Sequence, residues 1–210
     1  MYRLILASRS PRRRELLKLL GHPFICITSA VEEDTVTGEL PEHHVTRLSE
    51  LKARDVGAQR KNGIIIGSDT IVVLDSEILE KPASSGEAVD MLMRLQGQTH
   101  TVYTGFALYN TETRAIVTDY ETTQVTMRSF TRDIAHKYVD TGEPMDKAGA
   151  YGIQGYGAVL ITSIEGCYFN VMGLPLARLM EALHAFSGGT FRYFGPCENE
   201  TTTPSTESCP

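Results

Sequence analysis

The chain has 210 residues, 41% of them hydrophobic and 22% charged, which is the composition of a globular protein rather than of a disordered one. Its 20 basic and 26 acidic residues give a formal net charge of −6, which argues against a general coat for nucleic acid. The apolar runs, such as 64–66 and 71–74, are far shorter than the ~20 residues that a membrane span needs. Basic residues follow the apolar residues 4–7 at once, unlike in a signal peptide. We therefore expect a soluble, cytoplasmic protein that binds neither nucleic acid nor a membrane.

Basic residues gather at the start of the chain, where six basic side chains and one acidic side chain give the first 18 residues a net charge of +5. Residues 4–7 form a predicted strand, and a helix follows with Ser10 as its cap and Pro11 at its first position. Arg12 and Arg13 then fall in the first turn of that helix, where cations are unfavourable unless an anion lies nearby. The segment predicts a phosphate site; the alternative is a solvated basic face on a surface helix.

The rest of the chain alternates between predicted strands and helices, which is typical of an α/β fold. Strands are expected near 23–28, 64–74, 99–109 and 115–127, and between a glycine-rich segment, 147–157, and about residue 171. Helices are expected near 45–56, after the N-caps Ser84 and Thr131, and near 176–183. Residues 198–210 are rich in Thr, Ser, Glu and Pro and lack aliphatic side chains. We therefore predict one domain, 1–186, and a disordered tail, 187–210.

Cysteine and histidine positions predict no metal or redox centre. The cysteines at 26, 167, 197 and 209 form no C-x-x-C pair, and His43 and His44 have no third ligand at zinc spacing. Cys26 lies in an apolar run, which predicts a buried free thiol. The two histidines are expected on the surface.

Asp69 is the residue whose context points most directly to chemistry. It follows three isoleucines and Gly67, at a place where a strand would prefer an apolar residue. A carboxylate there is costly unless a cation or hydrogen bonds compensate it, so it is expected to face a ligand or metal. The alternative is an Asp that forms a turn or a cap. Glu32 and Glu33 could add carboxylates for a magnesium ion, or could belong to an exposed acidic loop.

Two weaker signals lie further along the chain. Lys81 follows a predicted hairpin, so it faces either the same site or solvent. Gln154 lies in the glycine-rich segment, where backbone can approach a ligand closely and an amide can bind a base edge; the alternative is a flexible connection. No P-loop, dinucleotide-binding glycine motif or nucleophile elbow occurs in the sequence.

Four motifs together resemble one family, the Maf (septum-formation-protein-like) nucleoside triphosphate pyrophosphatases. The motifs are Leu6-Ala7-Ser8-Arg9-Ser10-Pro11-Arg12-Arg13 with Glu15-Leu16-Leu17, Gly67-Ser68-Asp69-Thr70, Ile78-Leu79-Glu80-Lys81-Pro82, and Asp146-Lys147-Ala148-Gly149-Ala150-Tyr151-Gly152-Ile153-Gln154-Gly155. The resemblance runs in order from about residue 3 to 186. Arg9 is a mild departure, since a small residue is common there in the family.

The resemblance implies a long curved mixed sheet flanked by helices, with two lobes and a cleft between them, related to the inosine triphosphate pyrophosphatases. It implies hydrolysis of a nucleoside triphosphate to the monophosphate and pyrophosphate, with a divalent cation such as Mg²⁺ or Mn²⁺. A homodimer is also expected from the family. The block 151–154 resembles the branch that acts on dTTP and UTP.

The resemblance also assigns site residues. It implies Asp69 as proton acceptor, with Glu33, Lys52 and Lys81 as further catalytic residues. Asp69 and Glu33 are also the candidate metal ligands because they are carboxylates, and the sequence leaves open whether Asp69 holds the metal, orients the water or accepts its proton. Substrate-binding positions are Ser8, Arg12, Arg13, Thr70 and Gln154; of these, Arg13, Thr70 and Gln154 match positions tied to base specificity. Two alternatives stay open: a non-catalytic nucleotide-binding regulator of cell division, and the same chemistry on another base, such as CTP or 7-methyl-GTP.

Overall fold

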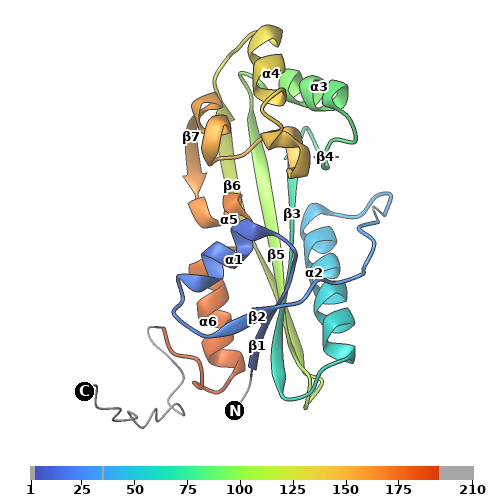
Figure 1. Ribbon diagram of the computed structural model, residues 1–210, viewed down its shortest axis with the longest axis vertical. Helices are drawn as coiled ribbons and strands as arrows, with labels where there is room; N and C mark the ends of the chain where they lie inside the picture. Colours follow the sequence, from blue (N-terminus) through green and yellow to red (C-terminus); the bar gives the residue numbers. More distant parts are fainter. Residues whose placement is uncertain (1–2, 35, 194–210) are drawn as a thin grey trace, which may run out of the picture.

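The computed structural model describes residues 3–34 and 36–193. A seven-stranded mixed sheet has the order β2-β1-β3-β5-β6-β7, with β4 beside β3. Its centre is three long antiparallel strands, β3 (Gly63–Leu74), β5 (Thr99–Asn110) and β6 (Ile116–Met127). They run along the long axis of the molecule and connect its two halves (Figure 1). The shorter strands are β1 (Arg3–Ala7), β2 (Phe24–Cys26), β4 (Glu77–Leu79) and β7 (Ile161–Gly166).

In one half, helices cover both faces of the sheet. Figure 1 shows α1 (Pro11–Lys18) and α6 (Leu176–Phe186) on one side and α2 (Pro41–Ala58) on the other. Strand alternation divides the core accordingly: Ile64 packs in the cluster with α1 and α6, whereas Ile65 packs with α2 residues. Because both faces are buried, β3 carries the continuous apolar run at 64–66 that the sequence displays.

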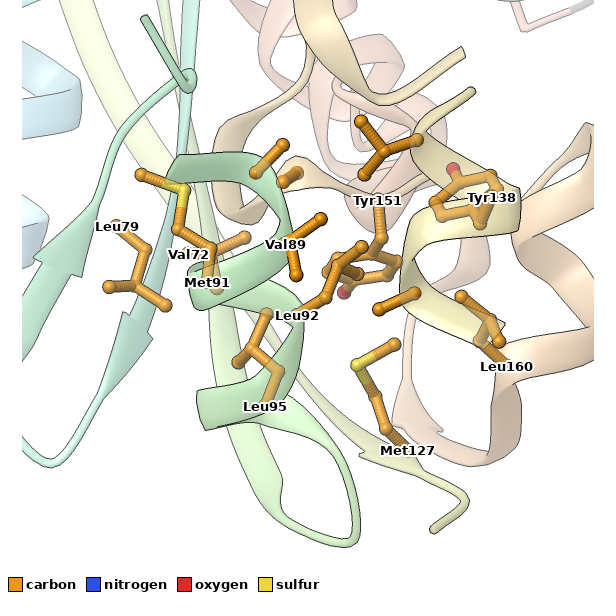
Figure 2. Packing of buried hydrophobic residues seen from close by; sticks show 14 of the residues in the cluster. Val72, Leu79, Val89, Met91, Leu92, Leu95, Met127, Tyr138, Tyr151 and Leu160 are labelled. Atoms are coloured by element: carbon orange, nitrogen blue, oxygen red, sulfur yellow. The ribbon is translucent and has the colours of Figure 1, made fainter. Parts of the chain in front are cut away.

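In the other half, α3 (Ser85–Leu95) and α4 (Arg132–Val139) pack together over the sheet. Figure 2 shows their buried contacts, with Leu92 and Tyr151 lying in the interior of the cluster. Three short 3₁₀ segments follow α4, and a short α-helix of five residues precedes α6. Their bounds are η1 (Glu143–Asp146), η2 (Ala148–Ala150), η3 (Gly155–Leu160) and α5 (Tyr168–Met172).

The local signals for helix starts are confirmed. The side chains of Ser10, Ser84 and Thr131 each accept a hydrogen bond from the backbone N–H three residues later. Pro11 occupies the first position of α1, where its missing N–H costs nothing. The predicted α/β fold with a long mixed sheet and flanking helices is therefore confirmed.

Several local predictions were wrong. Cys26 is exposed, because β2 is the edge strand of the sheet. His44 is only 2% exposed, since its ring packs inward and its Nδ1 lies 3.2 Å from Glu39 Oε2. The strand predicted up to residue 171 ends at Gly166, where φ is +125°, and α5 follows.

The first residues of the predicted tail, 187–193, lie within the described residues. Phe191 is buried in the cluster with α6, and its carbonyl oxygen lies 2.8 Å from His184 Nδ1. The rest of the predicted tail, 194–210, lies outside the described residues, as do Cys197 and Cys209. Within the described ranges, none of the helices combines the length and the apolar character needed to cross a bilayer.

Candidate active site

The sheet has an opening along one edge of β3. β1 pairs with β3 as far as Ala7 and Gly67, and β4 joins the same edge only from Val72. Residues 68–71 therefore have no neighbouring strand on that side, and Asp69 and Thr70 border a cavity of about 850 Å³. The cavity is lined from both halves of the molecule, by the turn into α1 and the loop 28–33 on one side and by the segment 145–153 on the other. Its volume is in the range of small-molecule sites.

On one face of β3, Asp69 meets Lys52 of α2. Asp69 points to the α2 side because it follows Ile65 at even spacing along the strand. The helix lies unusually close at this point, since a Cβ on Gly67 would be 2.0 Å from the Ser49 carbonyl oxygen. The close approach brings Lys52 Nζ to 2.6 Å from Asp69 Oδ1, with each residue only 6% exposed. The costly buried carboxylate is thus compensated by a cation.

Glu33 extends this pair into a four-residue network. Lys52 Nζ also donates to Glu33 Oε1 at 2.7 Å, and Lys81 Nζ donates to Glu33 Oε2 at 2.6 Å. Burial alone would raise the pKa of the Glu33 carboxyl, but the charge of Lys52 and the hydrogen bonds from both lysines lower that pKa to about 2. The ammonium group of Lys52 therefore bridges Glu33 and Asp69. We call the four residues Glu33, Lys52, Asp69 and Lys81 the carboxylate–lysine network.

The loop that carries Glu33 is fastened to α2 at two places. Asp55 Oδ2 accepts hydrogen bonds from Ser29 Oγ and Ala30 N, both at 2.8 Å. At the other end, Arg47 donates to both oxygens of Glu39 at 2.7 Å and to the Asp34 carbonyl oxygen at 3.0 Å. The helix α2 thus supplies Lys52 and also holds the loop that brings Glu33 to it.

On the opposite face of β3, Thr70 meets Arg13 of α1. Arg13 Nη2 donates to Thr70 Oγ1 at 2.8 Å, and Arg13 Nε donates to the Gly173 carbonyl oxygen at 2.7 Å. The Gly173 carbonyl also accepts from Ser68 Oγ, and Thr70 Oγ1 lies 3.0 Å from Thr104 Oγ1. Burial lowers the pKa of the Arg13 guanidinium below its ordinary value, and the charges of Asp69 and Glu33 offset only part of this effect. Neutral oxygens therefore fix the orientation of this cation.

The cavity brings together eight of the nine predicted site residues. They are Ser8, Arg12, Arg13, Glu33, Lys52, Asp69, Thr70 and Lys81. Gln154 is not among the lining residues and is exposed, although its neighbours Gly152 and Ile153 do line the cavity.

Sequence reasoning missed several residues that shape the site. Arg12 Nη1 donates to Asp146 Oδ2 at 3.0 Å, so an ion pair crosses the cavity from α1 to η1. Thr104 and Gly173 hold Thr70 and Arg13, as described above. Of Asp146, Thr104 and Gly173, only Asp146 lies in one of the four motifs given above, and none of the three is unusual in its local context.

Comparison with known proteins identifies the family of the chain. The family model described as Maf-like protein matches residues 3–186, which is most of the chain. The chain belongs to the Maf-like family. The match covers every residue of the carboxylate–lysine network and both partners of the Arg13–Thr70 bond.

Bacterial relatives named dTTP/UTP pyrophosphatase are similar over nearly their whole length. The protein of Desulforamulus reducens is 47% identical over 183 residues, which is 87% of this chain and 96% of the relative. That of Symbiobacterium thermophilum is 48% identical over 186 residues, 89% of this chain and 95% of the relative. That of Bacillus cytotoxicus is 47% identical over 189 residues, 90% of this chain and 98% of the relative.

Proposed function

We propose that this chain hydrolyses dTTP and UTP to the monophosphate and pyrophosphate, as a house-cleaning enzyme of the cytoplasmic nucleotide pool. The observation that carries the proposal is the carboxylate–lysine network at the open edge of β3, inside a cavity that is large enough for a nucleotide. The names of the Maf relatives, at 46–48% identity, support the reaction and its substrates.

Asp69 is proposed as the proton acceptor. In the reaction, a water oxygen bonds to phosphorus, the phosphoanhydride bond between the α and β phosphates breaks, and the water proton passes to a base. Asp69 suits this task because its Oδ1 is held by Lys52 while the residue borders the cavity. The hydrogen bond from Lys52 Nζ holds the carboxylate in one orientation.

The cationic side chains would bind the phosphates. Arg12 and Arg13 border the cavity from the first turn of α1, with Ser8 just before that helix. Lys81, which follows β4, borders the same cavity. A triphosphate and a leaving pyrophosphate both carry several negative charges, which guanidinium and ammonium groups stabilise. The pair Arg12–Asp146 is partly exposed, so Arg12 can exchange its carboxylate partner for a phosphate at small cost.

A divalent cation, Mg²⁺ or Mn²⁺, fits the same cavity. Asp69 and Glu33 would hold it, since carboxylate oxygens are the ligands that these hard cations prefer. In residues 3–34 and 36–193, no three His, Cys, Asp or Glu side chains cluster as a complete protein ligand set. Phosphate oxygens and water would therefore complete the shell, which is usual for Mg²⁺. Such a cation, when bound, stabilises negative charge on the phosphates.

Base selection is proposed to involve Arg13, Thr70 and Gln154. Arg13 and Thr70 are bonded to each other at the cavity wall, whereas Gln154 is exposed beside the wall residue Ile153. Gln154 would therefore reach the base only after its side chain turns toward the cavity. The homodimer that the family resemblance implies stays a prediction.

The decisive measurement is product formation from dTTP, UTP, CTP, the purine triphosphates and 7-methyl-GTP, with Mg²⁺ or Mn²⁺. We expect monophosphate and pyrophosphate from dTTP and UTP selectively. Turnover of another base would keep the chemistry and overturn the proposed specificity. If nucleotides bind but none is hydrolysed, the non-catalytic regulator becomes the better hypothesis. Release of inorganic phosphate instead would place the cleavage at a different bond.

A further inference from the structure

We infer that Glu143 is a positioning residue whose carboxylate holds the segment 152–157, so that Gly152 and Ile153 form one wall of the nucleotide cavity. The inference deepens the proposed function and rests on it, because it concerns how the same cavity accepts its substrate. Glu143 itself does not line the cavity.

Three donors converge on the Glu143 carboxylate. Its Oε1 accepts a hydrogen bond from Tyr138 Oη at 2.8 Å and another from Gly157 N at 3.0 Å. Its Oε2 accepts one from Tyr156 N at 2.8 Å. Two backbone groups of the glycine-rich segment are thus bound by one side chain, and hydrogen bonds to an ionised acceptor are stronger than neutral ones.

Tyr138 extends this hold to the cavity wall. Its hydroxyl oxygen accepts from Gly152 N at 3.0 Å while it donates to Glu143. The ring itself is fixed in α4, in the buried cluster between α3 and α4 (Figure 2). Gly152 and Ile153 line the cavity, so a chain of hydrogen bonds leads from Glu143 through Tyr138 to the wall.

The backbone of Glu143 is attached to the same wall. Lys147 Nζ donates to the Glu143 carbonyl oxygen and also pairs with Asp146 Oδ1 at 2.7 Å. Lys147 and Asp146 both line the cavity. Glu143 therefore contacts the segment 152–157 through its side chain and the cavity-lining residue Lys147 through its main chain.

The glycine spacing of the segment fits tight packing around this carboxylate rather than a flexible connection. A Cβ at Gly155, where φ is +69°, would lie 2.3 Å from Glu143 Oε2. A Cβ at Gly157 would lie 2.6 Å from Tyr138 Oη. Neither position tolerates a side chain without displacing a partner of the hydrogen-bond chain.

The carboxylate is ionised at neutral pH. Burial would raise the pKa of Glu143, but the hydrogen bonds from Gly157 N, Tyr156 N and Tyr138 lower it below its ordinary value. An amide in its place would keep the size and one acceptor oxygen, but its NH₂ group would oppose one of the backbone N–H donors.

The test is Glu143→Gln, followed by hydrogen exchange and by kinetics with dTTP and UTP. We expect exchange of the amides in 152–160 to be about tenfold faster and KM to rise about tenfold, with kcat within about twofold of the wild type. The matched control is Glu165→Gln, an exposed carboxylate on β7 in the same half of the molecule, which should change neither readout.

A second variant, Tyr138→Phe, removes the hydroxyl that links Glu143 to Gly152 and keeps the ring in the core. It should also raise KM. The double variant of Glu143→Gln and Tyr138→Phe should raise KM by less than the product of the two single effects. If Glu143→Gln does not fold, Tyr138→Phe with the same two readouts decides the question.

Several outcomes would overturn the inference. They are unchanged amide exchange in 152–160, a rise in KM without faster exchange, and a loss of kcat at constant KM. The proposed function fails separately: if the wild type does not hydrolyse pyrimidine triphosphates, exchange still tests whether Glu143 holds the segment, and binding of dTTP replaces KM.

Discussion

Lys52 and Arg13 lie on opposite faces of β3, where they contact the adjacent residues Asp69 and Thr70. The groups that hold the two cations differ in charge. Lys52 is bonded to two carboxylates, Asp69 and Glu33. Arg13 is bonded to two neutral oxygens, the Thr70 hydroxyl and the Gly173 carbonyl. Strand alternation alone places the two contacts on different faces, while the open edge of the sheet lets both border one cavity.

This difference in charge indicates different functions for the two faces of β3. The carboxylate–lysine network pairs two carboxylates with two ammonium groups, so the buried Asp69 and Lys52 each have a partner of opposite charge. Neutral oxygens orient the guanidinium of Arg13 but do not neutralise it, so its charge remains available to a phosphate. Chemistry is therefore expected on the α2 face and substrate positioning on the α1 face.

The largest effect is expected from Asp69→Asn. The amide cannot accept the water proton, whereas Lys52 keeps Glu33 as a partner, so the network is expected to stay in place. We expect kcat to fall by about 10³-fold or more while the affinity for nucleotide changes little. Pyrophosphate release gives the first quantity and calorimetric titration with dTTP gives the second.

Glu50→Gln is the matched control for this substitution, because Glu50 is on α2 but pairs only with Arg54 in the contacts of the described residues. It should retain wild-type turnover. An equal loss of binding and turnover in Asp69→Asn would mean that Asp69 acts by anchoring the substrate or the cation and not as the proton acceptor, and the division between the two faces would fail.

A smaller effect is expected from Arg13→Lys. A lysine keeps the charge but cannot donate from two nitrogens to Thr70 Oγ1 and the Gly173 carbonyl oxygen at once. We expect kcat/KM to fall by about 10²-fold, mainly through KM, because the cation is no longer held in one orientation.

Arg14→Lys controls for the change of residue type in the same helix, since Arg14 is exposed and does not line the cavity. Steady-state kinetics with dTTP compares the two variants. If Arg13→Lys behaves like Arg14→Lys, charge alone is sufficient at position 13, and the neutral oxygens have no positioning role.

The elements that local rules govern could be predicted from the sequence. Ser10, Ser84 and Thr131 act as caps because capping depends on neighbours three residues away. The apolar run before Asp69 likewise indicated a buried strand with a carboxylate that needs a partner. Cys26 was assigned to the interior because composition does not reveal which strand lies at the edge of a sheet.

The partners in the site could not be predicted from local sequence. Lys52 entered the site only through the family resemblance, because its contact with Asp69 depends on how closely α2 approaches β3 at Gly67. His44 is buried, and its Nδ1 lies 3.2 Å from Oε2 of Glu39 in the loop before α2. The Lys52–Asp69 contact spans 17 residues of chain and the His44–Glu39 contact spans 5, but both depend on how another segment packs against α2, so periodicity and spacing carry no signal for them.

The smallest expected effect is a pH dependence of stability on the α2 face. The pKa of Glu33 is lowered to about 2 by Lys52 and Lys81, from an ordinary value of 4.5. A carboxyl with a lowered pKa stabilises the fold above the unfolded value, and this contribution disappears as pH falls from 4.5 toward 2. Because the Glu33 side chain is 41% exposed, we expect Glu33→Gln to lower Tm by only about 1–2 °C at pH 6.

Thermal unfolding between pH 6 and pH 2 checks this window. The difference in Tm between the wild type and Glu33→Gln should shrink as pH falls through 4.5 and vanish near 2. Thr70→Val gives the comparison from the α1 face, where neutral oxygens hold Arg13. The difference in Tm between Thr70→Val and the wild type should therefore stay constant over the same pH range. A Glu33→Gln difference that does not depend on pH would mean that the lysines do not hold this carboxylate in solution, and the two faces would then no longer differ in the way that assigns chemistry to one of them.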